Sequence, residues 1–432
     1  MASRFRRLRF PLPSRFLLGL SISTGGLYLA AKQRELHADS RPPLSSVALK
    51  SSNEAIPRSE LLVANSNLPA EDYVCSLPME PYAWRFYGVF DGHNGHHCAA
   101  YLSKNLLRRM NDALWQEYLR DEKFSLKDIY RTIKETFLAV DNEIVNSPAQ
   151  RLRDEPSEAP IRTLAANTLQ EARSGASAIF CFYQGNIRKL HIAVVGDCRA
   201  ILGRRRKTDV ADAPPMYDVH ILSVDQTPDN PAEVARLKAA HPHEPHLFRD
   251  GSFLGWGITR AFGTGAMKWS REMQDWMERK AFGLKYRSVC QSPPYFTAEP
   301  EITTTTVEPG DFMIMASDGF WECLTNEEAV GLVGKWLEVT GGPLPGRNDM
   351  PSEDWVVERQ DLPVEITDGR THYQRWGVKK KFVCYDINAS EHLARNALGG
   401  ANKDVYNALL DLPPPHSRLL RDDISLAVVF FS

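Results

Sequence analysis

The stretch YGVFDGH, residues 87–93, ends an apolar run in a carboxylate, a bare glycine carbonyl and an imidazole within three residues. This order is typical of a buried strand that ends at Asp91. Two later segments have the same layout, namely FMIMASDG at 312–319 and DDISLAVVFF at 422–431. Carboxylates at the ends of three strands, far apart in sequence, are what a hard-metal site assembled by tertiary folding requires.

Each segment also has a simpler interpretation. Asp-Gly is a common turn signal, because both residues tolerate the backbone angles of turns. Likewise, His93 alone would fit an ordinary turn histidine. The metal-site hypothesis therefore rests on the combination of the three segments and not on any one of them.

Composition narrows the classes of protein. The 432 residues allow one large domain or two or three small ones, and a net charge of -2 argues against a nucleic-acid partner. Seven cysteines without a C-x-x-C pair indicate a reduced compartment rather than a disulfide framework or a zinc site. Neither G-x-x-x-x-G-K-[ST] nor G-x-G-x-x-G occurs, so nucleotide binding and kinase activity have no support.

The amino terminus is basic. Six arginines and Lys32 precede the first acidic residue, Glu35, as in a mitochondrial presequence over residues 1–35. Residues 16–31 form an apolar stretch just short of the roughly 17 to 25 residues of a membrane span. A secretory signal is the competing interpretation, but the arginine density and the cysteine usage favour mitochondria. The expected location is the matrix, or the inner membrane facing the intermembrane space if 16–31 stays as an anchor.

The remaining chain indicates a linker at 36–58 and one domain at 59–432. Apolar spacings of three and four predict helices over 99–114 and 126–144, the second with a capping-box start at Ser125 and Asp128. Residues 146–172 are polar and are expected to form a loop, and 175–183 and 187–195 to form a hairpin. Helices are also expected at 231–240 and from Thr325. Such segregated runs predict an α+β fold of two packed, mainly antiparallel sheets flanked by helices. Insertions are expected at 268–288, as a helical flap, and at 341–381.

Five segments occur in a characteristic order: DGHNG at 91–95, VGDCRA at 195–200, TRAFG at 259–263, ASDGFW at 316–321 and RDDIS at 421–425. This ordered set resembles the metal-dependent serine/threonine protein phosphatases of type 2C over roughly residues 60–432. The resemblance implies the same sandwich, with the metals in a cleft at one end. It also implies hydrolysis of phosphoserine and phosphothreonine in protein substrates through attack by a metal-bound water.

The resemblance also assigns residues. Two Mg2+ or Mn2+ ions would be bridged by Asp91, with the Gly92 carbonyl on the second ion and Asp318 and Asp422 on the first. Glu71, and less directly Asp72, would hold metal-bound water. His93 would be the general acid, since the pKa of an imidazole lies near neutral pH. A weak third metal would involve Asp197 and Glu322, or Asp197 would only hold a turn. Arg260 is expected to be structural.

Three positions depart from the usual pattern. Thr264 and Gln226 stand where relatives often have aspartate and histidine, and Asn67 replaces a phosphate-binding arginine. Asn67 and the segments SNLPAED at 66–72 and NPAEVARL at 230–237 resemble the mitochondrial pyruvate dehydrogenase phosphatase branch. We therefore expect a monomeric catalytic subunit that acts on mitochondrial phosphoproteins. The alternative is a weak or inactive scaffold on the same fold.

Overall fold

The computed structural model describes residues 45–49, 57–79, 83–154, 159–210, 213–281, 290–341, 355–414 and 416–432. The expected presequence 1–35 and its apolar segment 16–31 lie outside the described residues, as does much of the expected linker 36–58. No helix in the described part of the chain is long and apolar enough to cross a membrane.

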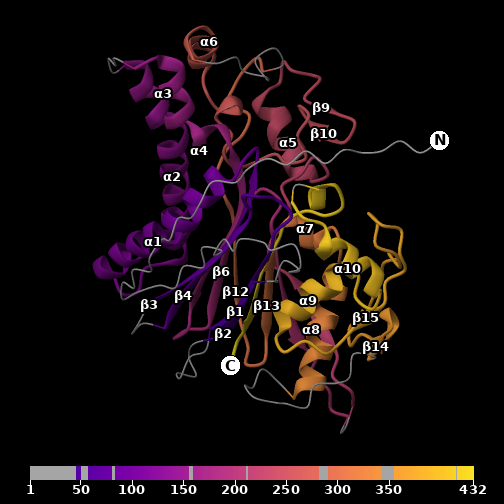
Figure 1. The fold of residues 1–432 in the computed structure, drawn as a ribbon. Helices are drawn as coiled ribbons and strands as arrows, with labels where there is room; N and C mark the ends of the chain where they lie inside the picture. The colour runs from indigo at the N-terminus through magenta and orange to yellow at the C-terminus, as the bar shows by residue number, and fades with distance from the viewer. Residues whose placement is uncertain are drawn as a thin grey trace, which may run out of the picture.

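Two antiparallel sheets face each other at the centre of the molecule (Figure 1). Sheet A has the strand order β1 (Ser45–Leu49), β2 (Arg58–Ala64), β16 (Ile424–Phe430), β13 (Phe312–Ala316), β7 (Arg199–Arg205) and β8 (Tyr217–Ile221). Sheet B has the order β12 (Glu301–Thr306), β6 (Lys189–Val195), β5 (Gly175–Gln184), β4 (Trp84–His93) and β3 (Tyr73–Met79), and β11 (Phe262–Gly263) pairs with β5. The predicted sandwich and its hairpin are confirmed.

Strand β1 corrects the expected linker. It pairs antiparallel with β2, from Ser45 opposite Val63 to Leu49 opposite Ser59. The pairing satisfies backbone groups along the edge of β2, which would otherwise be left open. The composition of residues 36–58 does not predict this strand, because the pairing depends on the open edge of β2.

The central strands are apolar throughout because both faces of each sheet are covered. In β13, Met313 and Met315 join the core between the sheets, together with Tyr87 of β4. Their neighbours Phe312 and Ile314 join the core beneath the helices of sheet A. Side chains of a strand alternate between its faces, so a continuous apolar run fills both cores.

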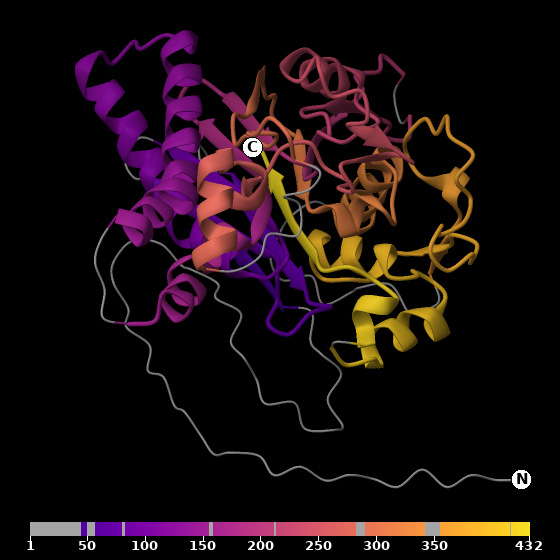
Figure 2. The same ribbon diagram turned by 90° about the horizontal axis from the view of Figure 1, so that it is seen from above.

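Helices α1 (His97–Arg120), α2 (Leu126–Asp154), α3 (Ile161–Thr168) and α4 (Gln170–Arg173) cover the outer face of sheet B (Figures 1 and 2). The two predicted helices are confirmed, and Asp128 accepts hydrogen bonds from the backbone and hydroxyl of Ser125. The expected loop at 146–172 is wrong. Ala149, Leu152, Ala165 and Leu169 are buried in the same core, and they hold helices over most of the described residues 146–154 and 159–172.

Sheet A is covered by a second helical layer: α7 (Asp318–Trp321), α8 (Asn326–Thr340), α9 (Ala389–Ala397) and α10 (Lys403–Asp411). Helix α8 begins with the predicted capping box of Thr325 and Glu328. The buried Glu328 carboxylate also pairs with Lys380 at 2.6 Å and with Arg359. These pairs fix the expected insertion to α8. Its described part contains β14 (Val356–Val357) and η2 (Arg359–Asp361), and β15 (Phe382–Val383) follows directly after it.

The segment between β8 and β12 lies at the upper end of the sheets in Figure 1. It contains α5 (Pro231–Ala240), as predicted, then β9 (Phe248–Arg249), β10 (Ser252–Phe253), η1 (Gly265–Met267) and α6 (Arg271–Lys280). Helix α6 lies in the expected insertion 268–288, of which 282–288 fall outside the described residues. The indole of Trp269, just before α6, donates to the carbonyl of Val145 at 3.0 Å, so this insertion is anchored on α2.

Candidate metal centre

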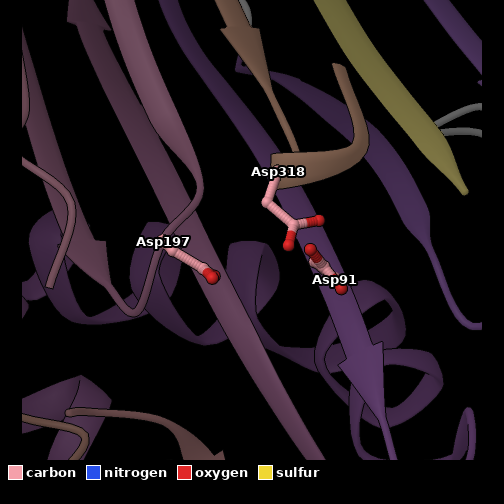
Figure 3. A group of neighbouring side chains, drawn as sticks. All are labelled: Asp91, Asp197 and Asp318. Atoms are coloured by element: carbon pink, nitrogen blue, oxygen red, sulfur yellow. The ribbon is translucent and has the colours of Figure 1, made fainter. Parts of the chain in front are cut away.

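Three aspartates from separate parts of the chain converge at one end of the sandwich (Figure 3). Asp91 lies near the end of β4, Asp197 follows β6, and Asp318 opens α7 directly after β13. One carboxylate oxygen from each residue lies within 4.8 Å of the others. Two of the three, Asp91 and Asp318, come from the two facing sheets, so the packing of the sandwich creates the group.

Such a group is electrostatically costly without a counter-charge. Two unit charges at this separation repel by about 3 to 4 kcal/mol at an effective dielectric constant of ~20. Burial, and then the charges of Asp72 and Asp318, raise the pKa of Asp91 well above its usual value. Burial and Asp318 raise the pKa of Asp197 to about 7. The site therefore favours protons or a cation beside these oxygens.

Both Asp-Gly steps are points of close approach and not only turn signals. A β-carbon at Gly92 would lie 2.5 Å from the carbonyl oxygen of Glu71, and the Gly92 amide donates to that oxygen at 3.1 Å. A β-carbon at Gly319 would lie 2.1 Å from the carbonyl oxygen of Asp423. Glycine therefore brings the backbones next to Asp91 and Asp318 into contact with their neighbours.

The predicted pair Glu71 and Asp72 lies beside this group. Glu71 accepts hydrogen bonds from the Gly95 amide and from the Asn67 side chain, both at 2.7 Å. Asp72 is 3% exposed, and its Oδ2 has no hydrogen-bond partner among the described residues. Burial, and then the charge of Asp423, raise the pKa of Asp72 well above its usual value. An unsatisfied buried oxygen of this kind calls for a ligand or a proton.

The structure does not bring the Asp422 carboxylate into the group of three. The backbone is close, because a β-carbon at Gly319 would lie 2.9 Å from Cβ of Asp422. However, the carboxylate pairs with Arg418, four residues earlier, and accepts from the Asp423 amide at 2.7 Å. The nearby guanidinium thus competes for the oxygens that the sequence suggested for a metal.

Asp423 is a positioning residue that sequence reasoning did not assign. Its buried carboxylate accepts from the backbone amides of Ser66, Asn67 and Glu71, the last two at 3.0 Å. It therefore connects the start of β16 to the loop that carries Glu71. The Asp422-Asp423 doublet was the available signal, but the sequence does not say which of its members faces the metal site.

His93 lies at the edge of the site. Its Nε2 is 3.0 Å from the Thr264 hydroxyl, and its ring makes a T-shaped contact with Trp256 at 5.4 Å. Burial, and secondarily Lys268, lower the pKa of His93 to about 4. Thr264, with φ of 50°, adopts the left-handed conformation. At neutral pH the imidazole is therefore uncharged and shares a hydrogen bond with Thr264.

The remaining predicted positions have distinct surroundings. Gln226 is fully buried, and its oxygen accepts from the Gly196 amide at 2.8 Å, which holds the turn before Asp197. Glu322 is half exposed and pairs with Arg375 instead of joining the group of three. Arg260 forms a buried ion pair with Glu233 at 2.5 Å, in keeping with a structural role.

The residues present fit a divalent cation. All three grouped side chains offer carboxylate oxygens, the ligand type that Mg2+ and Mn2+ prefer. Asp72, whose charge acts on Asp91, offers an unsatisfied buried oxygen, and the Gly92 carbonyl follows Asp91 directly in the chain as a further oxygen donor. This chemistry does not suit a thiolate- or imidazole-bound metal such as structural zinc.

Comparison with known proteins gives one family. Residues 67–349 match the family model described as Protein phosphatase 2C. A protein phosphatase 2C homolog of Schizosaccharomyces pombe is 34% identical over 377 residues, which cover 85% of this chain and 78% of the relative.

Two further relatives have mitochondrial names. The mitochondrial pyruvate dehydrogenase (acetyl-transferring) phosphatase 1 of Saccharomyces cerevisiae is 33% identical over 398 residues, covering 85% of this chain and 67% of the relative. The human mitochondrial pyruvate dehydrogenase (acetyl-transferring) phosphatase 2 is 29% identical over 404 residues, covering 80% of this chain and 72% of the relative. Among solved structures, a serine-threonine phosphatase 2C from Toxoplasma gondii matches with a TM-score of 0.49 and 15% identity, covering 90% of this chain and 100% of that chain.

Proposed function

Because the chain belongs to the protein phosphatase 2C family and is therefore a protein serine/threonine phosphatase, we propose that it dephosphorylates mitochondrial proteins. The pyruvate dehydrogenase complex is the leading substrate, since two relatives carry its phosphatase in their names. The observation that carries the catalytic proposal is the convergence of Asp91, Asp197 and Asp318 within 4.8 Å.

We propose the ligand set that the family resemblance implies for two divalent ions. Asp91, Asp318 and the Gly92 carbonyl would hold these ions, and the approach of Asp91 to Asp318 supports the proposal. Glu71 and Asp72 would orient water at the ions. When bound, Mg2+ or Mn2+ would neutralise phosphoryl charge and supply a nucleophilic water at neutral pH. Asp197 belongs to the same group, so it is the expected ligand of any weak third ion, with Glu322 as its exposed partner.

Asp422 completes the set only if its ion pair with Arg418 opens. Its backbone already packs against Gly319, so the carboxylate has to change rotamer and not chain position. A dication attracts a carboxylate more strongly than a half-exposed guanidinium does, because its charge is larger and its distance shorter. We therefore retain Asp422 as a proposed ligand.

His93 would act as the general acid toward the departing serine or threonine oxygen. Its pKa of about 4 leaves the ring uncharged at pH 7 before substrate binds. A phosphoryl dianion beside the ring would raise that pKa, because a nearby negative charge favours imidazolium. The hydrogen bond between Nε2 and the Thr264 hydroxyl, at 3.0 Å, holds the orientation of the ring.

Placement in the cell is also a proposal. The basic residues 1–35 would direct the chain to mitochondria, either to the matrix or, if 16–31 remains as an anchor, to the inner membrane facing the intermembrane space. Residues 59–432 would form the phosphatase domain, extended at its amino-terminal side by β1 and the start of β2. A monomeric catalytic subunit is the expected state.

The alternative is an inactive scaffold. One observation favours it: the Arg418 guanidinium forms an ion pair with the Asp422 carboxylate, which the metal would need as a ligand. Hydrolysis of a phosphothreonine peptide by the full-length chain, with Mn2+ and with EDTA, separates the two. We expect EDTA-sensitive turnover that Asp318→Asn abolishes. No turnover by a folded chain, or full turnover by Asp318→Asn, would refute the proposal.

A further inference from the structure

Two arginines converge on the rim of the acidic site. Arg418 lies in η3 (His416–Leu419) and pairs with Asp422, and Arg375 lies in the insertion and pairs with Glu322 at 3.3 Å. Their side chains are 43% and 39% exposed, so both can contact a solute. Burial and Asp318 raise the pKa of Glu322, and both arginines oppose that rise. The two positive charges are therefore close to the same carboxylate.

The backbone that carries these side chains is fixed. The indole of Trp376 donates to the carbonyl of Leu420 at 2.8 Å, which ties the insertion to the segment after η3. The buried Ser417 hydroxyl donates to the Ser66 carbonyl at 2.6 Å, and the Arg421 guanidinium donates to the Asn65 carbonyl at 2.6 Å. Arg418 is thus a long, half-exposed side chain on a rigid base beside the loop that leads to Glu71.

The loop beside Arg418 carries no positive charge at position 67. Asn67 is neutral, and its amide donates to Glu71 at 2.7 Å. The charge of Arg418 acts on this loop, because it lowers the pKa of Glu71 against the opposing effect of burial. A phosphate monoester dianion that enters the site would therefore meet the positive side chains of Arg375 and Arg418 at the rim.

We propose that Arg418 and Arg375 form a clamp that binds the phosphoryl group of the substrate. The inference rests on the proposed function of the site. A guanidinium presents a planar fork of N–H donors that matches two phosphoryl oxygens, so each arginine can exchange its rim carboxylate for the substrate. For Arg418 the exchange also releases Asp422 toward the aspartate group.

The test uses full-length Arg418→Ala, Arg375→Ala, the double variant and Arg418→Lys. The matched control is Arg370→Ala, an exposed arginine of the same segment whose backbone amide, at 2.7 Å from Asp368, is unaffected by the change. Each protein is assayed with Mn2+ on a phosphothreonine peptide and on an aryl phosphate, with inorganic phosphate as inhibitor. Calorimetry of inorganic phosphate gives binding without turnover.

The clamp predicts that KM, the inhibition constant of phosphate and its calorimetric Kd rise roughly 10-fold for each alanine variant and roughly 100-fold for the double variant. We expect kcat to change less than about threefold. The phosphate affinity of Arg418→Lys should lie between those of the wild type and Arg418→Ala, and Arg370→Ala should match the wild type. If only peptides with acidic neighbours lose affinity, while aryl phosphate and inorganic phosphate do not, the arginines bind flanking carboxylates and the clamp is refuted.

A purely structural role has a different signature. If Arg418 only neutralises Asp422, Arg418→Ala will tighten Mn2+ binding and leave phosphate binding unchanged, which refutes the clamp. Failure of the proposed function is recognised separately, because the wild type itself would then show no EDTA-sensitive hydrolysis. In that case the calorimetric Kd for phosphate still decides whether the arginines bind it.

Discussion

Replacing Gly319 with alanine should push helix α7 away from the segment that leads into β16, at the edge of the carboxylate site. The new β-carbon would lie 2.1 Å from the carbonyl oxygen of Asp423, whereas ordinary contact begins at 3.4 Å. The segments must therefore separate by about 1.3 Å (3.4 − 2.1), and the obstructing atom belongs to the backbone, which cannot rotate away. Asp423 also holds the Glu71 amide at 3.0 Å, so the displacement reaches both sides of the site.

The effect on activity should exceed the effect on stability. Misplacement of reacting groups by ~1 Å costs on the order of 100-fold in rate. Overpacking costs about 1 to 3 kcal/mol, and alanine in α7 recovers up to about 1 kcal/mol of helix propensity. We expect a folded protein with kcat/KM lowered about 100-fold.

The assay is metal-dependent hydrolysis of a phosphothreonine peptide, with urea unfolding measured on the same preparations. Gly369→Ala is the control, since nothing lies within 4 Å of a β-carbon there and its φ is not positive. Retention of kcat/KM within about threefold by a well-folded Gly319→Ala variant would refute the reasoning that this contact positions the ligands.

Three further predictions concern the acid, the insertion and the Arg260 network. His93→Ala should slow hydrolysis of phosphothreonine peptides far more than that of aryl phosphates, whose leaving groups need no proton; equal slowing argues against the acid role. Glu328→Gln should lower the unfolding free energy by about 3 kcal/mol, because Lys380 and Arg359 lose a buried partner. Glu338→Gln, at an exposed pair with Lys335, should cost under about 0.5 kcal/mol, and equal losses would contradict the assignment. Burial would raise the pKa of Glu233, but hydrogen bonds from Arg260 and Arg236 outweigh it and lower the pKa to about 2. The stability lost in Glu233→Gln should therefore be largest above pH 4.5 and shrink as pH falls toward 2, and a pH-independent loss would exclude this linkage.

Local patterns predicted much of the fold. The apolar runs before Asp91 and Asp318 are the ends of β4 and β13, and the Thr325 and Glu328 pattern is the start of α8. The polarity pattern gave the wrong secondary structure where tertiary contacts determine it. Residues 146–172 look polar, but a few spaced apolar side chains such as Ala149 and Leu169 suffice to hold helices against the core.

The site was predictable only in part. The approach of Asp91 to Asp318 was expected, but Asp197 was expected only for a weak third metal or a turn, and it joins them because the ends of β4, β6 and β13 meet. The pairing of Asp422 with Arg418 depends on the 3-10 turn η3, which no periodicity announces. The role of Gln226 is visible only in the structure, where its side-chain oxygen accepts a hydrogen bond from the Gly196 amide.

Calorimetric titration of the full-length chain with Mn2+ tests the central claim most directly. We predict binding by the wild type that Asp91→Asn and Asp318→Asn each weaken severely, while both variants remain folded. Unchanged Mn2+ affinity in either variant, or no binding by the wild type, would contradict the assignment of these carboxylates as the metal site.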